Sequence, residues 1–366
     1  MPAFSGMSVE NKLSTDKTAA LSIIWQRVFR REHIGVYESF FDLGGDPWLA
    51  IELFLDIEKV FRRNLTPLLI YQAPTIASLA ALLQSSSVPA LPKCVQLKAG
   101  SLGPPVFLTH GMGGNILEFF DLVHHLPARH TFYGLQARGT DGLEEPCSSI
   151  DEMAHFHLEG IKALQPQSPY ILIGYSLGGL VALEMARHLA EAGKTIALLV
   201  MIDSYPSPRY APLAQRLGVV SRTARHYASR KLWTSGSKTI AHANRRSGQR
   251  LDTLEGPAGL APVRPSVGIA FTPAMRRVQE AAVRALRNYK PRFYHGRIRF
   301  VRAATPLHFP DDPEKVWAKF TDHLEVETVP GNHHEILTTQ YESLARVISR
   351  YLHELSVESL TGSSDQ

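Results

Sequence analysis

The stretch GYSLGG, residues Gly174 to Gly179, directly follows the apolar run Tyr170–Ile173. A continuous apolar run that ends in Gly-Tyr-Ser is typical of a buried parallel strand, and apolar residues from Leu177 to Leu189 recur at helical spacing. Ser176 is therefore predicted to lie on a sharp turn between a strand and a helix. In a nucleophile elbow, such a turn lifts the serine hydroxyl off the sheet. The alternative is a glycine-rich turn without chemistry, so the serine needs partners.

The chain has 366 residues, of which 44% are hydrophobic, and its composition changes at residues 84–92. Ser and Pro replace periodic apolar residues there, as expected of a linker between two domains. Beyond it, strand-like runs alternate with helical stretches, which predicts a doubly wound, mostly parallel α/β sheet with its chemistry at the carboxyl ends of the strands. The runs are Val106–Thr109, Thr131–Leu135, Tyr170–Ile173, Ile196–Ile202, Ile298–Val301 and Val326–Val329.

Three strand ends carry reactive residue types in the chain order Ser176, Asp203 and His333. An imidazole takes the serine proton and returns it to the leaving group, while a buried carboxylate orients the imidazole. Asp203 has a simpler alternative role as a cap of the following turn, and Asp322, in an expected helix, is the reserve acid. His334 competes with His333 as the base. We favour His333, because only one of two adjacent side chains on a turn is expected to face the serine.

A fourth strand end supplies HGMGG, residues His110 to Gly114. Glycines there would let the backbone approach a substrate closely. The backbone N–H of Met112, together with that of Leu177, would form a two-donor oxyanion hole. No cluster of His and Cys has zinc-ligand spacing, so we expect no metal.

With these motifs in this order, residues 105–354 resemble the thioesterase domain that ends nonribosomal peptide and polyketide synthases. The resemblance implies an α/β-hydrolase fold with a helical lid at about residues 207–273. It implies that an acyl chain passes from a phosphopantetheine thioester to a serine, and then to water or an internal nucleophile. Residue by residue, Ser176, Asp203 and His333 match the family's triad, and Met112 matches its oxyanion donor.

Residues 15–85 resemble a peptidyl or acyl carrier domain, through FFDLGGDPWLAIEL at Phe40–Leu53 and helical apolar spacing, which predict a small all-α four-helix bundle. The family places its phosphopantetheine serine just after GGD, where this chain has Pro47. Proline has no hydroxyl, so we expect a degenerate carrier domain without a covalent phosphopantetheine and no other cofactor. Residues 86–104 are then the linker and 355–366 a flexible tail.

The expected lid is basic: residues 204–251 contain ten Lys or Arg and no Asp or Glu. This charge is either a solvated face or, at residues such as Arg222, Arg225 and Arg230, a contact surface for an acidic carrier protein, coenzyme A phosphates or an anionic membrane. No nucleic-acid-binding motif accompanies it. The sequence has neither an 18-residue apolar run nor the apolar core of a signal peptide, so we expect a cytoplasmic protein that is not integral to a membrane.

Together these features predict a thioesterase-type serine hydrolase. It would release an acyl, peptidyl or polyketide chain from a carrier-protein or coenzyme A thioester, in secondary-metabolite or fatty-acyl biosynthesis. Two alternatives remain: an acyltransferase or cyclase that passes the acyl group to an alcohol or amine, and a noncatalytic protein that docks carriers.

Overall fold

The computed structural model of the protein describes residues 9–63, 65–85, 92–101, 103–127, 129–222, 273–306 and 308–361. For residues 9–16, 47, 48 and 356–361 it describes the backbone alone. Among the described residues, no helix combines the length and the apolar character needed to cross a membrane.

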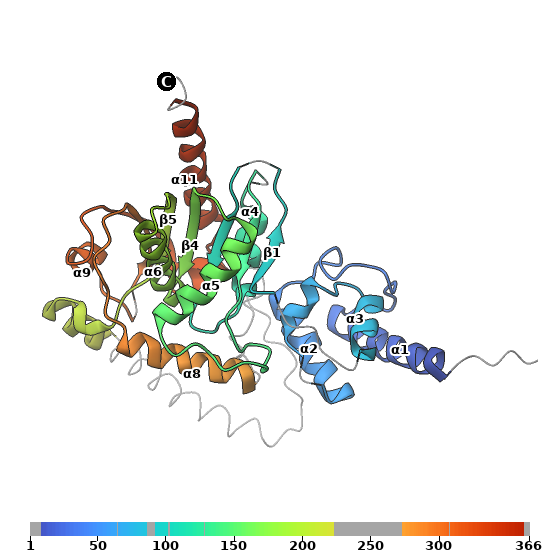
Figure 1. Ribbon diagram of the computed structural model, residues 1–366. Helices are drawn as coiled ribbons and strands as arrows, with labels where there is room; N and C mark the ends of the chain where they lie inside the picture. Colours follow the sequence, from blue (N-terminus) through green and yellow to red (C-terminus); the bar gives the residue numbers. More distant parts are fainter. Residues whose placement is uncertain are drawn as a thin grey trace, which may run out of the picture.

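The N-terminal region is helical (Figure 1). Its elements are α1 (Val9–Phe29), α2 (Pro47–Phe61), the 3-10 helix η1 (Pro67–Tyr71) and α3 (Ile76–Gln84). Trp25 and Phe40 are fully buried between them, with their ring centroids 5.8 Å apart. Asp46 caps α2 by accepting a hydrogen bond from the backbone N–H of Leu49 at 2.9 Å. This confirms the predicted small all-α region.

The rest of the chain is built on one seven-stranded sheet, in the order β1-β3-β2-β4-β5-β6-β7. All neighbouring strands are parallel except β1, which pairs with β3 in antiparallel fashion. The predicted fold class is confirmed. The strands are β1 (Cys94–Lys98), β2 (Val106–Thr109), β3 (Phe132–Leu135), β4 (Tyr170–Tyr175), β5 (Ile196–Ile202), β6 (Ile298–Thr305) and β7 (Leu324–Asn332).

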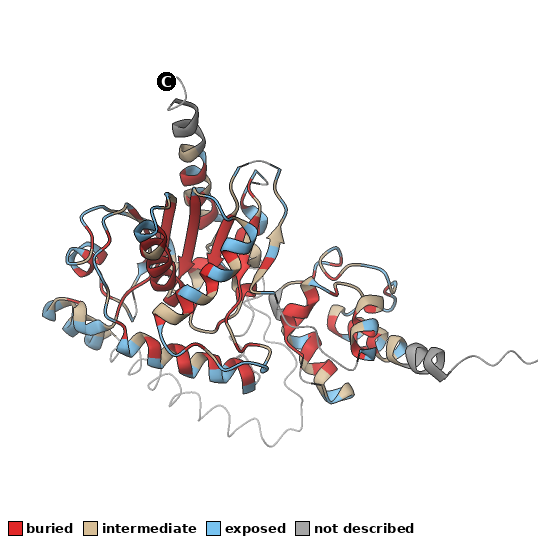
Figure 2. Cartoon of the chain, viewed as in Figure 1, coloured by how far each residue is buried: buried red, intermediate tan, exposed pale blue. Residues whose placement is uncertain are grey.

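Helices cover both faces of this sheet, so its central strands are buried throughout (Figure 2). Successive side chains of a strand point to opposite faces, and in β4 Leu172 belongs to one core cluster while Ile171 and Ile173 belong to the other. The helices are α4 (Phe120–His125), α5 (Ile150–Leu164), α6 (Leu177–Glu191), α8 (Pro273–Asn288), α9 (Pro313–Trp317), α10 (Glu335–Thr338) and α11 (Tyr341–Thr361), with 3-10 helices η2 (Ile116–Phe119) and η3 (Pro208–Tyr210).

The helical region contacts the sheet domain beside β1 (Figure 1). Leu68 of η1 belongs to the same apolar cluster as Ile116 and Leu117 of η2. The ring of Phe41 stacks on that of Phe120, with centroids 5.7 Å apart. Apolar side chains on the segment that follows the HGMGG turn thus form part of this contact.

Two predicted boundaries differ from the structure. Residues 94–98, which we assigned to the linker, form β1, whose alternation is obscured because only Val95 of its five residues is buried. The predicted tail, residues 355–366, is helical up to Thr361 as the end of α11. Of the predicted lid, η3 and a helix at residues 213–222 are described, whereas residues 223–272, with Arg225 and Arg230, lie outside the described residues.

The GYSLGG turn depends on close contact between backbones. A Cβ on Gly178 would lie 2.2 Å from the carbonyl oxygen of Thr109 at the end of β2. We predict that Gly178→Ala lowers the free energy of unfolding by about 1–3 kcal/mol, because the helix must shift away from the sheet. Chemical denaturation measures this loss. Gly218→Ala is the control, since its Cβ would meet its nearest atom at 3.4 Å; an equal loss in both variants would contradict the steric account.

Candidate active site

Ser176 lies on the turn between β4 and α6, with a φ of 55° and a ψ of −120°. A positive φ is uncommon for a residue with a side chain, and such strain is often found at functional sites. The turn is held by the neighbouring strand, because the backbone N–H of Ser176 donates to the carbonyl of Ile202 at 2.8 Å. The serine is thereby fixed at the carboxyl end of the sheet.

Asp203 and His333 lie at the ends of two further parallel strands, β5 and β7. The Nε2 atom of His333 lies 3.0 Å from the Oγ atom of Ser176, and its Nδ1 atom lies 2.8 Å from the Oδ2 atom of Asp203. Asp203 is 2% exposed, and its Oδ1 atom accepts a hydrogen bond from the backbone N–H of Ala303 at 3.2 Å. The structure therefore brings together the three side chains that the sequence singled out.

The imidazole of His333 is also fixed by Tyr175, the residue before the serine. The two rings stack with centroids 4.9 Å apart, and the Tyr175 hydroxyl donates to the backbone carbonyl of His333 at 2.7 Å. Burial raises the pKa of Tyr175, so the hydroxyl keeps the proton that it donates. Sequence analysis missed this contact, because the two residues are 158 positions apart.

The two alternative residues, His334 and Asp322, make different contacts. His334 is exposed, and its backbone N–H donates to the Oδ1 atom of Asn332 at 3.0 Å. Asp322 is exposed in a bend just before β7, at the opposite end of that strand from His333. Our expectation of a helix there was wrong, because α9 ends at Trp317.

The HGMGG turn follows β2, and the backbone N–H of Gly114 closes it by donating to the carbonyl of Gly111 at 3.1 Å. His110 is buried, and its Nδ1–H donates to the same carbonyl at 2.8 Å. Burial lowers the pKa of His110, which keeps the ring neutral. Met112 is the next residue of this turn after Gly111. Leu177 is the first residue of α6, and the backbone N–H groups of a helix's first turn have no partner within the helix. Their pairing as oxyanion donors stays a prediction.

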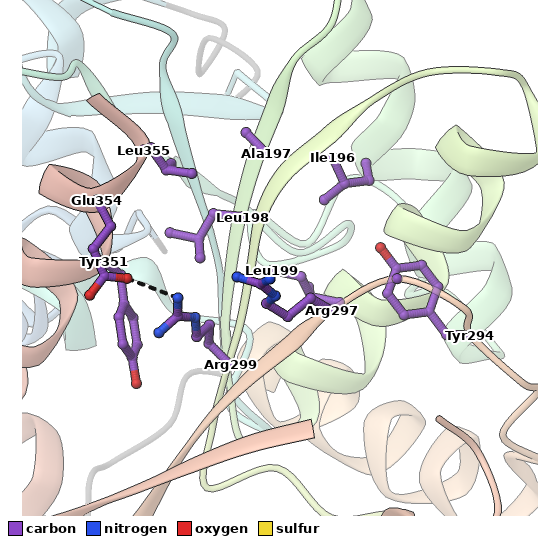
Figure 3. A pocket seen from close by; sticks show the side chains of 11 residues that line it. Ile196, Ala197, Leu198, Leu199, Tyr294, Arg297, Arg299, Tyr351, Glu354 and Leu355 are labelled. Carbon is purple, nitrogen blue, oxygen red and sulfur yellow. Dashed lines mark hydrogen bonds and ion pairs between the residues drawn. The ribbon is translucent and has the colours of Figure 1, made fainter. Parts of the chain in front are cut away.

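Two other features of the described residues lie away from this site. A pocket of about 90 Å³ is lined by residues such as Leu198, Arg299 and Glu354 (Figure 3). The pocket is lined by the first residues of β5 and β6 and by α11, so it lies at the amino-terminal end of these strands, opposite Ser176. Arg299 is already paired with Glu354 at 2.8 Å.

The second feature is a group of donor atoms on Asp151, His155 and His188 that lie within 4.8 Å of one another. The Nη2 atom of Arg292 lies 2.8 Å from the Oδ1 atom of Asp151, and the Nη2 atom of Arg187 lies 3.8 Å from the same oxygen. A metal ion there would face two guanidinium groups, so an ion-pair network explains the cluster better. The expectation of no metal stays a prediction.

Comparison with known protein families assigns the sheet domain to a family. The family model described as thioesterase domain matches residues 104–352. The chain belongs to the thioesterase domain family. A second family model, described as phosphopantetheine attachment site, matches residues 19–83, so a carrier domain precedes the thioesterase domain as in nonribosomal peptide synthetases.

Two relatives of this chain are much longer proteins. The chain is 34% identical over 207 residues to a dimodular nonribosomal peptide synthase of Bacillus subtilis (strain 168), which covers 56% of the chain and 9% of the relative. It is also 34% identical over 179 residues to an indigoidine synthase of Dickeya dadantii (strain 3937). This match covers 49% of the chain and 12% of the indigoidine synthase. The chain thus spans about a tenth of the length of these relatives.

A solved structure covers both domains. The crystal structure of a four-domain nonribosomal peptide synthetase, in its holo form bound to AMP and glycine, matches 96% of this chain and 27% of its own. The TM-score is 0.54 and the sequence identity 23%, which establishes similarity of fold.

The match to the carrier family overturns our expectation that the chain carries no phosphopantetheine. A phosphopantetheine attachment domain implies a covalent phosphopantetheine prosthetic group. Our inference rested on the single residue Pro47, whereas the family match spans residues 19–83. Pro47 is the first residue of α2, and proline as an amino acid has no hydroxyl oxygen.

The thioesterase domain also holds a carboxyl group that sequence analysis missed. Glu118 of η2 accepts a hydrogen bond from the backbone N–H of Gly111, next to Met112. Burial raises the pKa of Glu118 to about 8, and the bond from Gly111 only partly offsets this effect. Glu118 lies in the apolar stretch ILEFF, where nothing in the sequence distinguishes it from a solvent-facing helix residue.

This raised pKa predicts a pH-dependent stability. Between the ordinary value of 4.5 and about 8, folded Glu118 keeps a proton that the unfolded chain has released. The folded state binds more protons over this window, so its stability falls as the pH rises. Relative to wild type, Glu118→Gln should gain melting temperature between about pH 5 and pH 8. Glu280→Gln, exposed on α8, is the control; parallel pH profiles for wild type and Glu118→Gln would refute the shift.

Proposed function

We propose that this thioesterase domain hydrolyses an acyl or peptidyl thioester through an acyl-serine intermediate, with Ser176 as the nucleophile. The proposal rests on the contacts of His333 with two other side chains. Its Nε2 atom lies 3.0 Å from the Oγ atom of Ser176, and its Nδ1 atom lies 2.8 Å from the Oδ2 atom of Asp203. His333 is the general base and then the general acid, and Asp203 orients its ring and stabilises the imidazolium.

In the first step, the Oγ atom of Ser176 attacks the thioester carbonyl carbon while its proton passes to the Nε2 atom of His333. The carbonyl oxygen becomes an oxyanion, which the backbone N–H groups of Met112 and Leu177 stabilise. The tetrahedral intermediate collapses, the C–S bond breaks, and the imidazolium gives its proton to the leaving thiolate. The products are a free thiol and an ester on Ser176.

In the second step, a water molecule attacks the ester carbonyl and loses a proton to the Nε2 atom of His333. Collapse of the second tetrahedral intermediate breaks the bond to the Oγ atom of Ser176, which recovers its proton from His333. A free acid leaves. An alcohol or amine in place of water would yield an ester or amide, and mass analysis of the products with and without such an acceptor distinguishes transfer from hydrolysis.

Carrier-tethered chains are the substrate class that this domain order implies, because a carrier domain directly precedes the thioesterase domain. The released product would then be an acid made by stepwise assembly on carriers.

Replacing the nucleophile tests the proposal directly. We expect Ser176→Ala to lower kcat by a factor of about 10⁴ or more, because no covalent intermediate forms, while the melting temperature stays close to that of wild type. Turnover of a short acyl thioester of N-acetylcysteamine, followed by thiol release, measures the loss. Undiminished turnover in Ser176→Ala, or a well-folded wild-type protein without activity on any acyl thioester, would overturn the proposal.

The adjacent histidines form a matched pair for testing the base. His333→Ala removes the imidazole that contacts both Ser176 and Asp203, and kcat should fall by a factor of about 10⁴. His334→Ala removes an exposed ring and should cost far less. The same assay compares them, and the reverse order of damage would transfer the role of base to His334.

A further inference from the structure

The helix at residues 213–222, here called the Arg222 helix, contacts the segment between β6 and α9 through two side chains. Gln215 donates to the carbonyl of Asp312 at 3.2 Å, and Arg222 makes the larger set of contacts. Arg222 contacts both carboxylate oxygens of Asp311, at 2.6 and 2.8 Å. It also donates to two backbone carbonyls, that of Pro306 at 2.9 Å and that of Phe309 at 2.8 Å. The charge that we considered for docking an anionic partner is therefore engaged within the domain.

The same loop places an aromatic ring against the proposed base. The ring of Phe309 lies 4.5 Å from that of His333, centroid to centroid. It also stacks on Tyr205, two residues beyond Asp203, with centroids 5.3 Å apart. Phe309 thus contacts the imidazole with its side chain while its own carbonyl accepts a hydrogen bond from Arg222.

The shape of the guanidinium is essential to this contact. An isolated exposed ion pair contributes little to stability, and Asp311 is more than half exposed. The planar fork of arginine, however, donates in several fixed directions at once, and here it joins three residues of one loop. A lysine ammonium has the same charge without that fixed fork, so it does not reproduce all three contacts.

We propose that Arg222 is a positioning residue for His333. By fixing Pro306 and residues 308–311, it keeps the Phe309 ring against the imidazole, which then stays aligned between Ser176 and Asp203. The rings of Tyr175 and His334 also contact this imidazole, with centroids 4.9 and 5.6 Å away, and neither residue belongs to the loop. The inference rests on the proposed function, since it assigns His333 the role of base.

Three variants test it, each assayed with the uncharged N-acetylcysteamine thioester, which requires no docking of an anionic carrier. Arg222→Gln should lower kcat about tenfold with little change in KM, because the base is misaligned after the substrate has bound. Arg222→Lys should lose a similar factor despite its retained charge. Arg216→Gln, exposed on the same helix, should keep the wild-type kcat.

A second readout does not depend on turnover. Labelling of Ser176 by a small fluorophosphonate requires the base but no thioester. The labelling rate should fall about tenfold in Arg222→Gln. Phe309→Leu, which keeps an apolar side chain but removes the ring, should show the same loss in both assays. It also tests the proposal if Arg222→Gln fails to fold.

The outcomes separate this inference from the proposed function. If the wild-type protein turns over thioesters and Arg222→Gln or Phe309→Leu matches its kcat and labelling rate, the positioning role is wrong. Full recovery of kcat by Arg222→Lys would also contradict it, because charge alone would then suffice. A folded wild-type protein that neither turns over thioesters nor becomes labelled at Ser176 would instead overturn the proposed function.

Discussion

The site depends on three parallel strands ending at one edge of the sheet. Ser176, Asp203 and His333 follow β4, β5 and β7, and hydrogen bonds between neighbouring strand ends hold the turns in place. The backbone N–H of Ser176 donates to Ile202, and that of Asp203 donates to Val301 at 2.7 Å. A shift in the register of one strand relative to its neighbours would therefore separate the imidazole from the serine or from the carboxylate. The glycines of GYSLGG allow this arrangement, because strand, helix and the end of β2 meet there almost without space for side chains.

Much of this arrangement was readable from the sequence, because each candidate side chain directly follows an apolar run. The runs predicted the strands, and the strand ends predicted where Ser176, Asp203 and His333 would meet. The sequence did not predict β1, because it is a short edge strand with one buried residue, Val95. The contact between Tyr175 and His333, like that between Glu118 and Gly111, arises from chain folding and leaves no local pattern.

Two further interpretations changed once the family match and the contacts within the domain were known. Pro47 suggested a carrier domain without phosphopantetheine, but the family match over residues 19–83 implies the prosthetic group. Arg222 was grouped with basic residues as a contact for anions, whereas its partners Pro306, Phe309 and Asp311 lie 84 to 89 positions along the chain. A charge count identifies a basic segment, but the contacts decide whether a given charge is free to bind a partner.

The aromatic contacts extend the site beyond its three reacting side chains. Tyr175 and Phe309 both lie against the imidazole of His333, and each belongs to a different part of the domain, β4 and the loop before α9. Orientation of a general base matters because proton transfer requires short, aligned contacts. Backbone hydrogen bonds, ring packing and the carboxylate of Asp203 act together on one imidazole.

The most direct test of this account is to trap the covalent intermediate. Rapid acid quench during turnover of a slowly hydrolysed acyl thioester, followed by proteolysis and mass spectrometry, identifies the acylated peptide. The account predicts that the acyl mass is found on the peptide that contains Ser176 and disappears as product forms. Turnover without acylation of Ser176, or acylation of a different residue with matching kinetics, would contradict it.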